Sequence, residues 1–185
     1  MRRGMTVSLI IISLAALAGC AGQELTDVTL IQTLGVDGPG PVELTALGDD
    51  YGQGVRYHTR GETVTDAQES LKSLGDTRLE VTHVAQVVLG ETADVEDTLW
   101  REVMDRKSGY GATVWLTQGP AADLLAWGQD PSRRLKALEE NGGVRAPTIL
   151  EALSTLVREG RVELPVLAIS EGELALAGYQ IVEAR

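Results

Sequence analysis

Apolar and polar residues alternate along much of the chain, and a period of two predicts β-strands. The alternation is clearest over residues 79–89, where the odd positions hold five apolar residues and His83. This segment therefore predicts one long strand with His83 on its apolar face. Residues 48–54, rich in Gly and Asp, predict a link between two strands. Shorter alternating or β-branched runs predict the other strands at 28–36, 42–47, 55–59, 113–117, 162–170 and 173–182.

Apolar residues also recur at intervals of three and four, which predicts amphipathic helices. Thr63 with Asp66 three residues later matches a helix-start pattern, and Asp130 before Pro131 offers an N-cap with a first-turn proline. Gly160 ends the last apolar stripe. The predicted helices cover residues 64–74, 95–105, 120–127, 131–141 and 147–159.

The order of these elements predicts the fold class. Adjacent strands at both ends of the chain predict hairpins, whereas the strands in the middle alternate with helices and need crossovers. This mixture predicts an α+β fold, with a mixed β-sheet and helices packed on it. The length of 185 residues fits a single domain.

The N-terminal residues match an export signal. Arg2 and Arg3 precede an uncharged run, and its apolar stretch at 7–18 is too short for a transmembrane helix, which needs about 20 residues. The run ends in Leu17-Ala18-Gly19-Cys20, which resembles the bacterial lipobox. In that motif the cysteine thiol is diacylated and the chain is cut just before it. We therefore expect Cys20 to be the lipid attachment site.

This interpretation divides the chain into three parts. Residues 1–19 are expected to be a signal peptide, 20–26 a lipidated tether, and 27–185 an exported domain on the extracytoplasmic face of a membrane. The chain carries 16 Lys and Arg against 27 Asp and Glu, a net charge of -11, so nucleic acid is not an expected partner. A single cysteine cannot form a disulfide within the chain.

Candidate catalytic and metal-binding residues are few. His83 could act as a general base or ligand, but a hydrogen-bonded core histidine accounts for its position better. With His58 the only other histidine and Cys20 used by lipid, no zinc-type cluster can form. Asp49 and Asp50 could hold a hard cation weakly, although a solvated acidic loop accounts for them better. We therefore predict no catalytic residues, no metal, no cofactor and no enzymatic activity.

Two further patterns have simple structural interpretations. Residues 35–40 are glycine-rich, but no Lys-Ser/Thr pair follows and a strand comes next, so a turn is expected and not a phosphate loop. Trp100, Trp115 and Trp127 are expected to be core or interface aromatics.

Several segments, in order, resemble the Ger(x)C family, the lipoprotein C subunit of bacterial spore-germination receptors. The lipobox cysteine comes first, and the other matching segments are Leu34-Gly35-Val36-Asp37, Gly61 to Ala67, Thr82 to Glu91, Leu99 to Arg106, Leu164-Pro165-Val166 and Leu176 to Tyr179. On this resemblance, residues 27–185 correspond to the family's N-terminal domain.

The resemblance implies a non-enzymatic assembly or scaffold subunit in nutrient-triggered spore germination. It would be anchored through diacylglyceryl and acyl chains on Cys20 to the outer surface of the spore inner membrane. Its partners would be a polytopic membrane subunit and a transporter-like membrane subunit. The alternative is a small-solute-binding lipoprotein of a transport system. A cell-envelope hydrolase is disfavoured because the sequence offers no plausible nucleophile, base or metal set.

Overall fold

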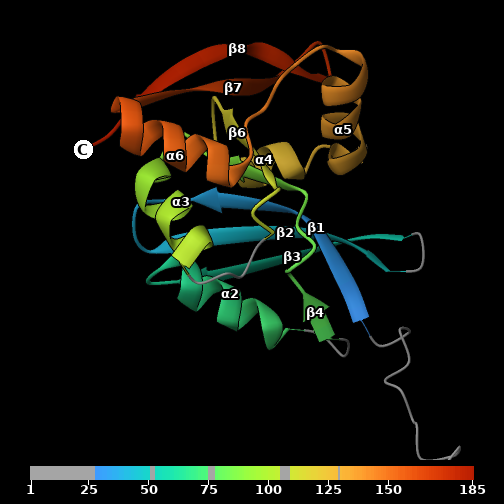
Figure 1. Ribbon diagram of the computed structural model, residues 1–185. Helices are drawn as coiled ribbons and strands as arrows, with labels where there is room; N and C mark the ends of the chain where they lie inside the picture. The colour runs from blue at the N-terminus through green and yellow to red at the C-terminus, as the bar shows by residue number, and fades with distance from the viewer. Residues whose placement is uncertain (1–27, 51–52, 75–77, 105–108, 129) are drawn as a thin grey trace, which may run out of the picture.

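The computed structural model describes residues 28–50, 53–74, 78–104, 109–128 and 130–185 (Figure 1). These residues form one mixed sheet of eight strands with five helices around it. The strands are β1 Val28–Asp37, β2 Val42–Asp50, β3 Gln53–Gly61, β4 Arg78–Glu80, β5 Gln86–Leu89, β6 Thr113–Thr117, β7 Arg161–Ser170 and β8 Glu173–Glu183. The helices are α2 Val64–Lys72, α3 Val95–Met104, α4 Ala121–Leu125, α5 Pro131–Asn141 and α6 Ile149–Glu159.

The sheet has a parallel centre and antiparallel edges. Its main path runs β3-β2-β1-β5-β6-β7-β8, and the short β4 pairs with the first residues of β1. Strands β1, β5, β6 and β7 are mutually parallel, whereas β2 and β3 on one side and β8 on the other are antiparallel to their neighbours. The prediction of a mixed sheet with packed helices is therefore confirmed.

Helices cover both faces of this sheet. Helices α2, α3 and α6 bury their apolar sides against one face, and α4 and α5 pack on the other, so the sheet lies between two clusters of buried side chains. Consecutive strand residues point to opposite clusters, as the pleat requires. Val114 and Leu116 belong to the first cluster, and Trp115 between them belongs to the second and is fully buried. Within the described residues, no helix is long and apolar enough to span a membrane.

Local capping chemistry sets the helix ends. Thr63 accepts a hydrogen bond from the Asp66 backbone N–H, and Asp130 caps α5 through the N–H of Arg133 in the same way. Gly160 ends α6 in the left-handed conformation, with φ of 71°. These three predicted signals are confirmed, because each satisfies backbone groups that a helix end leaves unpaired.

The prediction of one strand over residues 79–89 is wrong. The sequence offset between β1 and its parallel partner is 50 residues at β4 and 53 at β5, so three extra residues must leave the ladder between them. Residues 81–85 do this in a turn, where the N–H of Val84 bonds to the carbonyl of Val81. His83 lies in this turn and is exposed, so the prediction that it is a core histidine is also wrong.

Two boundaries also differ from prediction. Residues 48–50 and 53–54 belong to strands and not to a link, because β2 continues through Asp50 and β3 begins at Gln53, so Asp49 is an exposed strand residue. Helix α6 begins at Ile149 and not at 147, since Thr148 and Glu151 form a reciprocal capping box. That box was visible in the sequence as Thr-x-x-Glu and was missed.

Candidate functional site

The one functional residue predicted from sequence, Cys20, lies outside the described residues. Strand β1 begins at Val28, so seven residues separate the cysteine from the fold. Fully extended, a segment of that length spans about 25 Å, at about 3.3–3.6 Å per residue.

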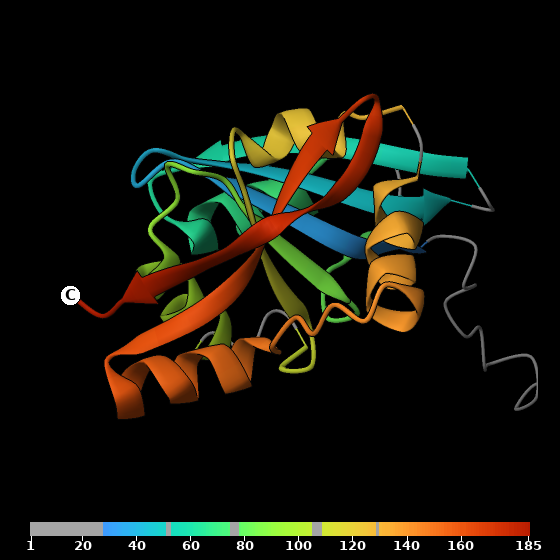
Figure 2. The same cartoon turned by 90° about the horizontal axis from the view of Figure 1, so that it is seen from above.

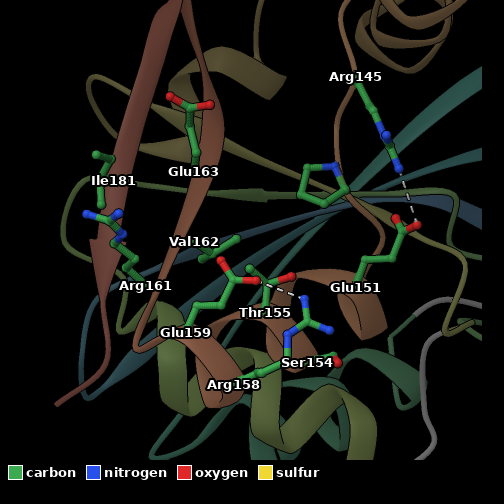
Figure 3. Close-up of a pocket in the computed structure, with 11 residues that line it drawn as sticks. Arg145, Glu151, Ser154, Thr155, Arg158, Glu159, Arg161, Val162, Glu163 and Ile181 are labelled. Carbon is green, nitrogen blue, oxygen red and sulfur yellow. Dashed lines mark hydrogen bonds and ion pairs between the residues drawn. The ribbon is translucent and has the colours of Figure 1, made fainter.

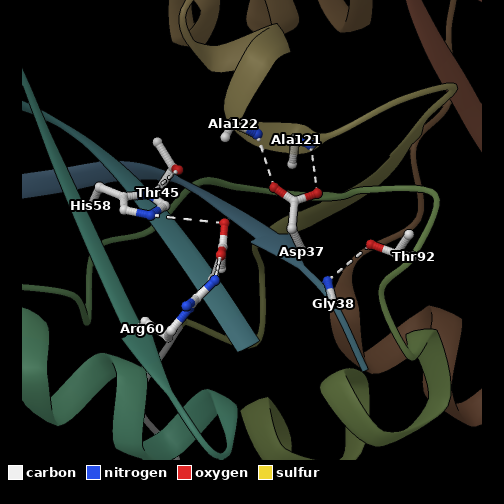
Figure 4. Close-up of polar contacts among 9 residues, drawn as sticks. Asp37, Gly38, Thr45, His58, Arg60, Thr92, Ala121 and Ala122 are labelled. Carbon is white, nitrogen blue, oxygen red and sulfur yellow. Dashed lines mark hydrogen bonds and ion pairs between the residues drawn. The ribbon is translucent and has the colours of Figure 1, made fainter. Parts of the chain in front are cut away.

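The carboxyl ends of β1 and β5 meet in a tightly built junction. Asp37, the last residue of β1, is buried, and its two carboxylate oxygens accept hydrogen bonds from the backbone N–H groups of Ala121 (2.7 Å) and Ala122 (3.0 Å) at the start of α4. The next residue, Gly38, donates its N–H to the Thr92 hydroxyl at 3.1 Å (Figure 4). One carboxylate thus joins β1 to the start of α4.

Two glycines make this junction possible. A Cβ atom on Gly35 would lie 2.7 Å from Leu125 Cδ1, so glycine lets α4 pack directly on β1. A Cβ atom on Gly90 would overlap the Asp37 carboxylate. The segments around Gly35 and Gly90 meet here although they are far apart in the sequence. The predicted turn over 35–40 is confirmed beyond Asp37, because its first residues still belong to β1.

A pocket of about 500 Å³ opens beside the junction. Three of its charged groups have partners, since Arg60 on β3 forms an ion pair with Glu43 on β2 and the Asp37 carboxylate accepts hydrogen bonds from α4. His58 lies 3.9 Å from Glu43 through Nε2 and 3.2 Å from the Thr45 hydroxyl through Nδ1 (Figure 4). Among the described residues no group of three His, Cys, Asp or Glu side chains could hold a metal ion.

A groove of about 660 Å³ lies where β6 and β7 diverge. These strands pair only at Leu116–Val166 and Thr117–Leu167. Nearer the start of β6, the backbone of Pro147 takes the place of β7, because the Val114 N–H donates to the Pro147 carbonyl at 2.9 Å. The groove therefore lies between the separated backbones of residues 145–147 and of the first half of β7, with α6 at one side (Figure 3).

The groove is polar and balanced in charge. Its long side chains carry both signs, and Arg145–Glu151 (3.8 Å) and Arg158–Glu159 (2.9 Å) form ion pairs within it. Hydrogen bonds from the backbone N–H and the hydroxyl of Thr148 lower the pKa of the Glu151 carboxyl, with a smaller contribution from Arg145. Such a solvated surface suits polar contact better than the capture of a small apolar ligand.

The two outer strands of the sheet differ in their side chains. On β3, the exposed residues Arg56, His58 and Arg60 alternate along the strand. On β8, residues 174–182 include no charged residue and no proline, and Tyr179 and Ile181 are 48% and 55% exposed. Within the described part of the chain, the outer edge of β8 has no strand partner (Figure 2).

The tryptophans do not form a ligand-binding group. Trp115 is buried in the core, as expected, whereas Trp100 on α3 is 41% exposed. Trp127 donates its indole N–H to the Gly172 carbonyl at 2.9 Å and so ties the segment after α4 to the turn between β7 and β8.

Sequence reasoning missed Asp37 and the two open strand edges. Asp37 had a recognisable signal, an acidic residue at the end of a buried strand. The strand edges had none, because strand order is a long-range property. In comparisons with known proteins, no family model, no curated protein and no solved structure matched this chain.

Proposed function

We propose that this chain is a lipid-anchored, non-enzymatic assembly domain of a spore germinant receptor, held on the outer surface of the spore inner membrane. The observation that carries the proposal is the place of Cys20 in the sequence, behind a short apolar signal and seven residues before the first strand. Two acyl chains on this residue give stable anchoring where one chain gives marginal binding. The short tether then keeps the domain within about 25 Å of the lipid surface.

The junction at Asp37 brings together two of the segments on which the family resemblance rests, because the Gly90 N–H donates to the Val36 carbonyl at 2.9 Å. A Cβ atom on Gly90 would overlap the Asp37 carboxylate, and one on Gly35 would press on the Leu125 side chain. The proposed partners are the polytopic and transporter-like membrane subunits, and the polar groove beside α6 offers a surface for contact with them.

Membrane anchoring is tested by replacing the acylated residue. Full-length chains carrying Cys20→Ala or the control Gly22→Ala are compared by detergent phase separation and membrane fractionation. We expect Gly22→Ala to stay in the detergent phase and Cys20→Ala to lose most of its detergent-phase protein. The anchoring proposal is wrong if Cys20→Ala partitions like the control.

Receptor assembly needs a separate test. We expect the anchored chain, solubilised from spore membranes in mild detergent, to co-purify with the two membrane subunits of a germinant receptor. Recovery of an ABC transporter permease in their place would support the alternative of a solute-binding lipoprotein.

One observation favours that alternative, a pocket of about 420 Å³ between the β2–β3 hairpin and the α4–α5 segment. Its volume lies in the range of about 300–1,000 Å³ typical of small-molecule sites. Its lining combines apolar and polar side chains, among them Leu47, Val55, Leu125, Trp127, Arg56 and Ser132. The alternative is tested by measuring the melting temperature of the chain with each of a panel of small nutrients, because a nutrient that binds the native state raises it. The rise should then be smaller in Trp127→Leu than in the control Trp100→Leu.

A further inference from the structure

Strand β8 ends the sheet with an edge suited to pairing with another strand. The backbone N–H and C=O groups along an outer edge can extend the ladder to another chain, and proteins usually protect such edges with charge or proline. Between Glu173 and Glu183 the strand has neither. Its side chains there are apolar or small except for Tyr179 and Gln180.

A bulge brings the exposed apolar residues of β8 to one face. The register with β7 shifts because Leu176 pairs with Leu167 and Gly178 with Val166, so that Ala177 is an extra residue. The shift reverses the alternation, and Tyr179 and Ile181 consequently lie on the same face as Leu176. Leu176 packs against the α4–α5 cluster, whereas Tyr179 and Ile181 are about half exposed.

From these features we infer that β8 is a self-association strand, and that its partner is β8 of a second copy of this chain, paired antiparallel about Gln180. This register places Tyr179 of each copy opposite Ile181 of the other, and Gly178 opposite Val182. Aromatic residues opposite β-branched residues are favourable cross-strand pairs. A register centred on Tyr179 would place that residue opposite its own copy. A register centred on Ile181 would place Tyr179 opposite Glu183. Both would separate Tyr179 from Ile181.

The pairing is weak, and the lipid anchor strengthens it. Residues 177–183 of two copies bury far less than the roughly 1,200 Å² typical of stable complexes. The net charge of -11 on each chain also opposes association in solution. Confinement to one membrane raises the effective concentration of the copies without any new contact. This strengthening rests on the proposed anchoring, whereas the pairing register does not.

Cysteine cross-linking tests the register directly. In the proposed pair, residue 180 faces its own copy at a Cα–Cα distance of about 4.5–5.5 Å, within the range for a disulfide. Membranes containing full-length Gln180→Cys are oxidised and analysed on a non-reducing gel. We expect a product of twice the chain mass.

Three controls make the result specific. The unmodified chain measures any product that forms through Cys20. The variant His58→Cys places the thiol on β3, at the opposite edge of the sheet. The variant Glu183→Cys places it on β8, but in the proposed register residue 183 faces Ala177 of the second copy and not the other cysteine. We expect all three to give little dimer. Adding Ile181→Lys to Gln180→Cys should reduce the dimer on the order of tenfold, because it removes the Tyr179–Ile181 contact and places a charge on the outer strand.

Each outcome decides the inference. It is overturned if Gln180→Cys gives no dimer, if His58→Cys or Glu183→Cys gives as much, or if the product has the mass of another protein. If Ile181→Lys lowers expression or thermal stability, Tyr179→Thr replaces it with the same expected direction. Fractionation of Cys20→Ala reports on anchoring alone, so loss of anchoring and loss of pairing are distinguished.

Discussion

The two outer strands of this sheet have the same backbone arrangement but different side chains. Each is the second strand of an antiparallel hairpin at an edge of the sheet. Strand β3 carries three exposed cationic or titratable residues, and Glu43 on its neighbour lies close to His58 and Arg60. Strand β8 carries exposed Tyr179 and Ile181 over its second half. Charge is a common protection of strand edges, and β3 carries it, whereas β8 has no charged residue over 174–182.

The largest expected effect comes from the core beneath each edge. Leu44 on β2 and Leu164 on β7 are fully buried in the same cluster. Replacing either with alanine should lower the free energy of unfolding by about 2–5 kcal/mol, the usual cost of a Leu-sized cavity. Urea denaturation followed by tryptophan fluorescence and circular dichroism should give one transition in both variants. Separate transitions in Leu164→Ala would mean that the β7–β8 hairpin is an independent unit.

The second largest expected effect on stability comes from Asp37, at the end of the central strand β1. Asp37→Ala removes the acceptors of two backbone N–H groups of α4 and should cost roughly 2–4 kcal/mol, because a hydrogen bond to a charged group contributes about 1.5–3 kcal/mol. Asp123→Ala, at an exposed position in the same pocket, is the matched control and should change stability by less than about 0.5 kcal/mol. Equal effects in the two variants would contradict the role given to Asp37.

The protective charge on β3 can be removed. Arg56→Thr combined with Arg60→Thr should change stability by less than about 1 kcal/mol, since exposed ion pairs contribute little. The same pair of substitutions in the His58→Cys chain should raise its oxidative dimer toward the level of Gln180→Cys. An unchanged dimer level would show that charge is not what keeps β3 unpaired.

The smallest expected effect is a pH dependence of stability that arises from Glu151, in the first turn of α6. The folded-state pKa of Glu151 is lowered, so its contribution to stability is present above the unfolded pKa, near 4.5, and is lost as the pH falls through the lower folded value. Glu151→Gln should therefore melt at a lower temperature than the unmodified chain at pH 7, and the gap should narrow at pH 3. A gap of the same size at both pH values would contradict the assignment.

Much of the fold could be predicted because it depends on local chemistry. The caps at Thr63 and Asp130, the stop at Gly160 and the order of strands and helices all follow from short-range pattern. Residues 79–89 show the limit of such reasoning, since their alternation is regular while their pairing with β1 requires three residues to leave the ladder. That requirement depends on β1, about 50 residues away, and it places His83 at the surface.

The candidate site was less predictable for the same reason. Asp37 accepts hydrogen bonds from α4 only when that helix packs over β1. Strand β8 is an outer strand only in the observed strand order of the sheet. The bulge at Ala177, which aligns Leu176 with Tyr179 and Ile181, is a register shift that alternation cannot locate. Pro165 on β7 was a usable signal for the groove and not for the β8 edge, because proline cannot donate to a ladder and β7 pairs with β6 only at Val166 and Leu167.

The central claim is that Cys20 is the lipidated first residue of an exported domain. Mass spectrometry of the N-terminal peptide from membrane-extracted protein tests it most directly. We expect a peptide that begins at Cys20 and carries the mass of a diacylglyceryl group on that residue. A peptide that retains residues before Cys20, or one that begins at an unmodified cysteine, would contradict it.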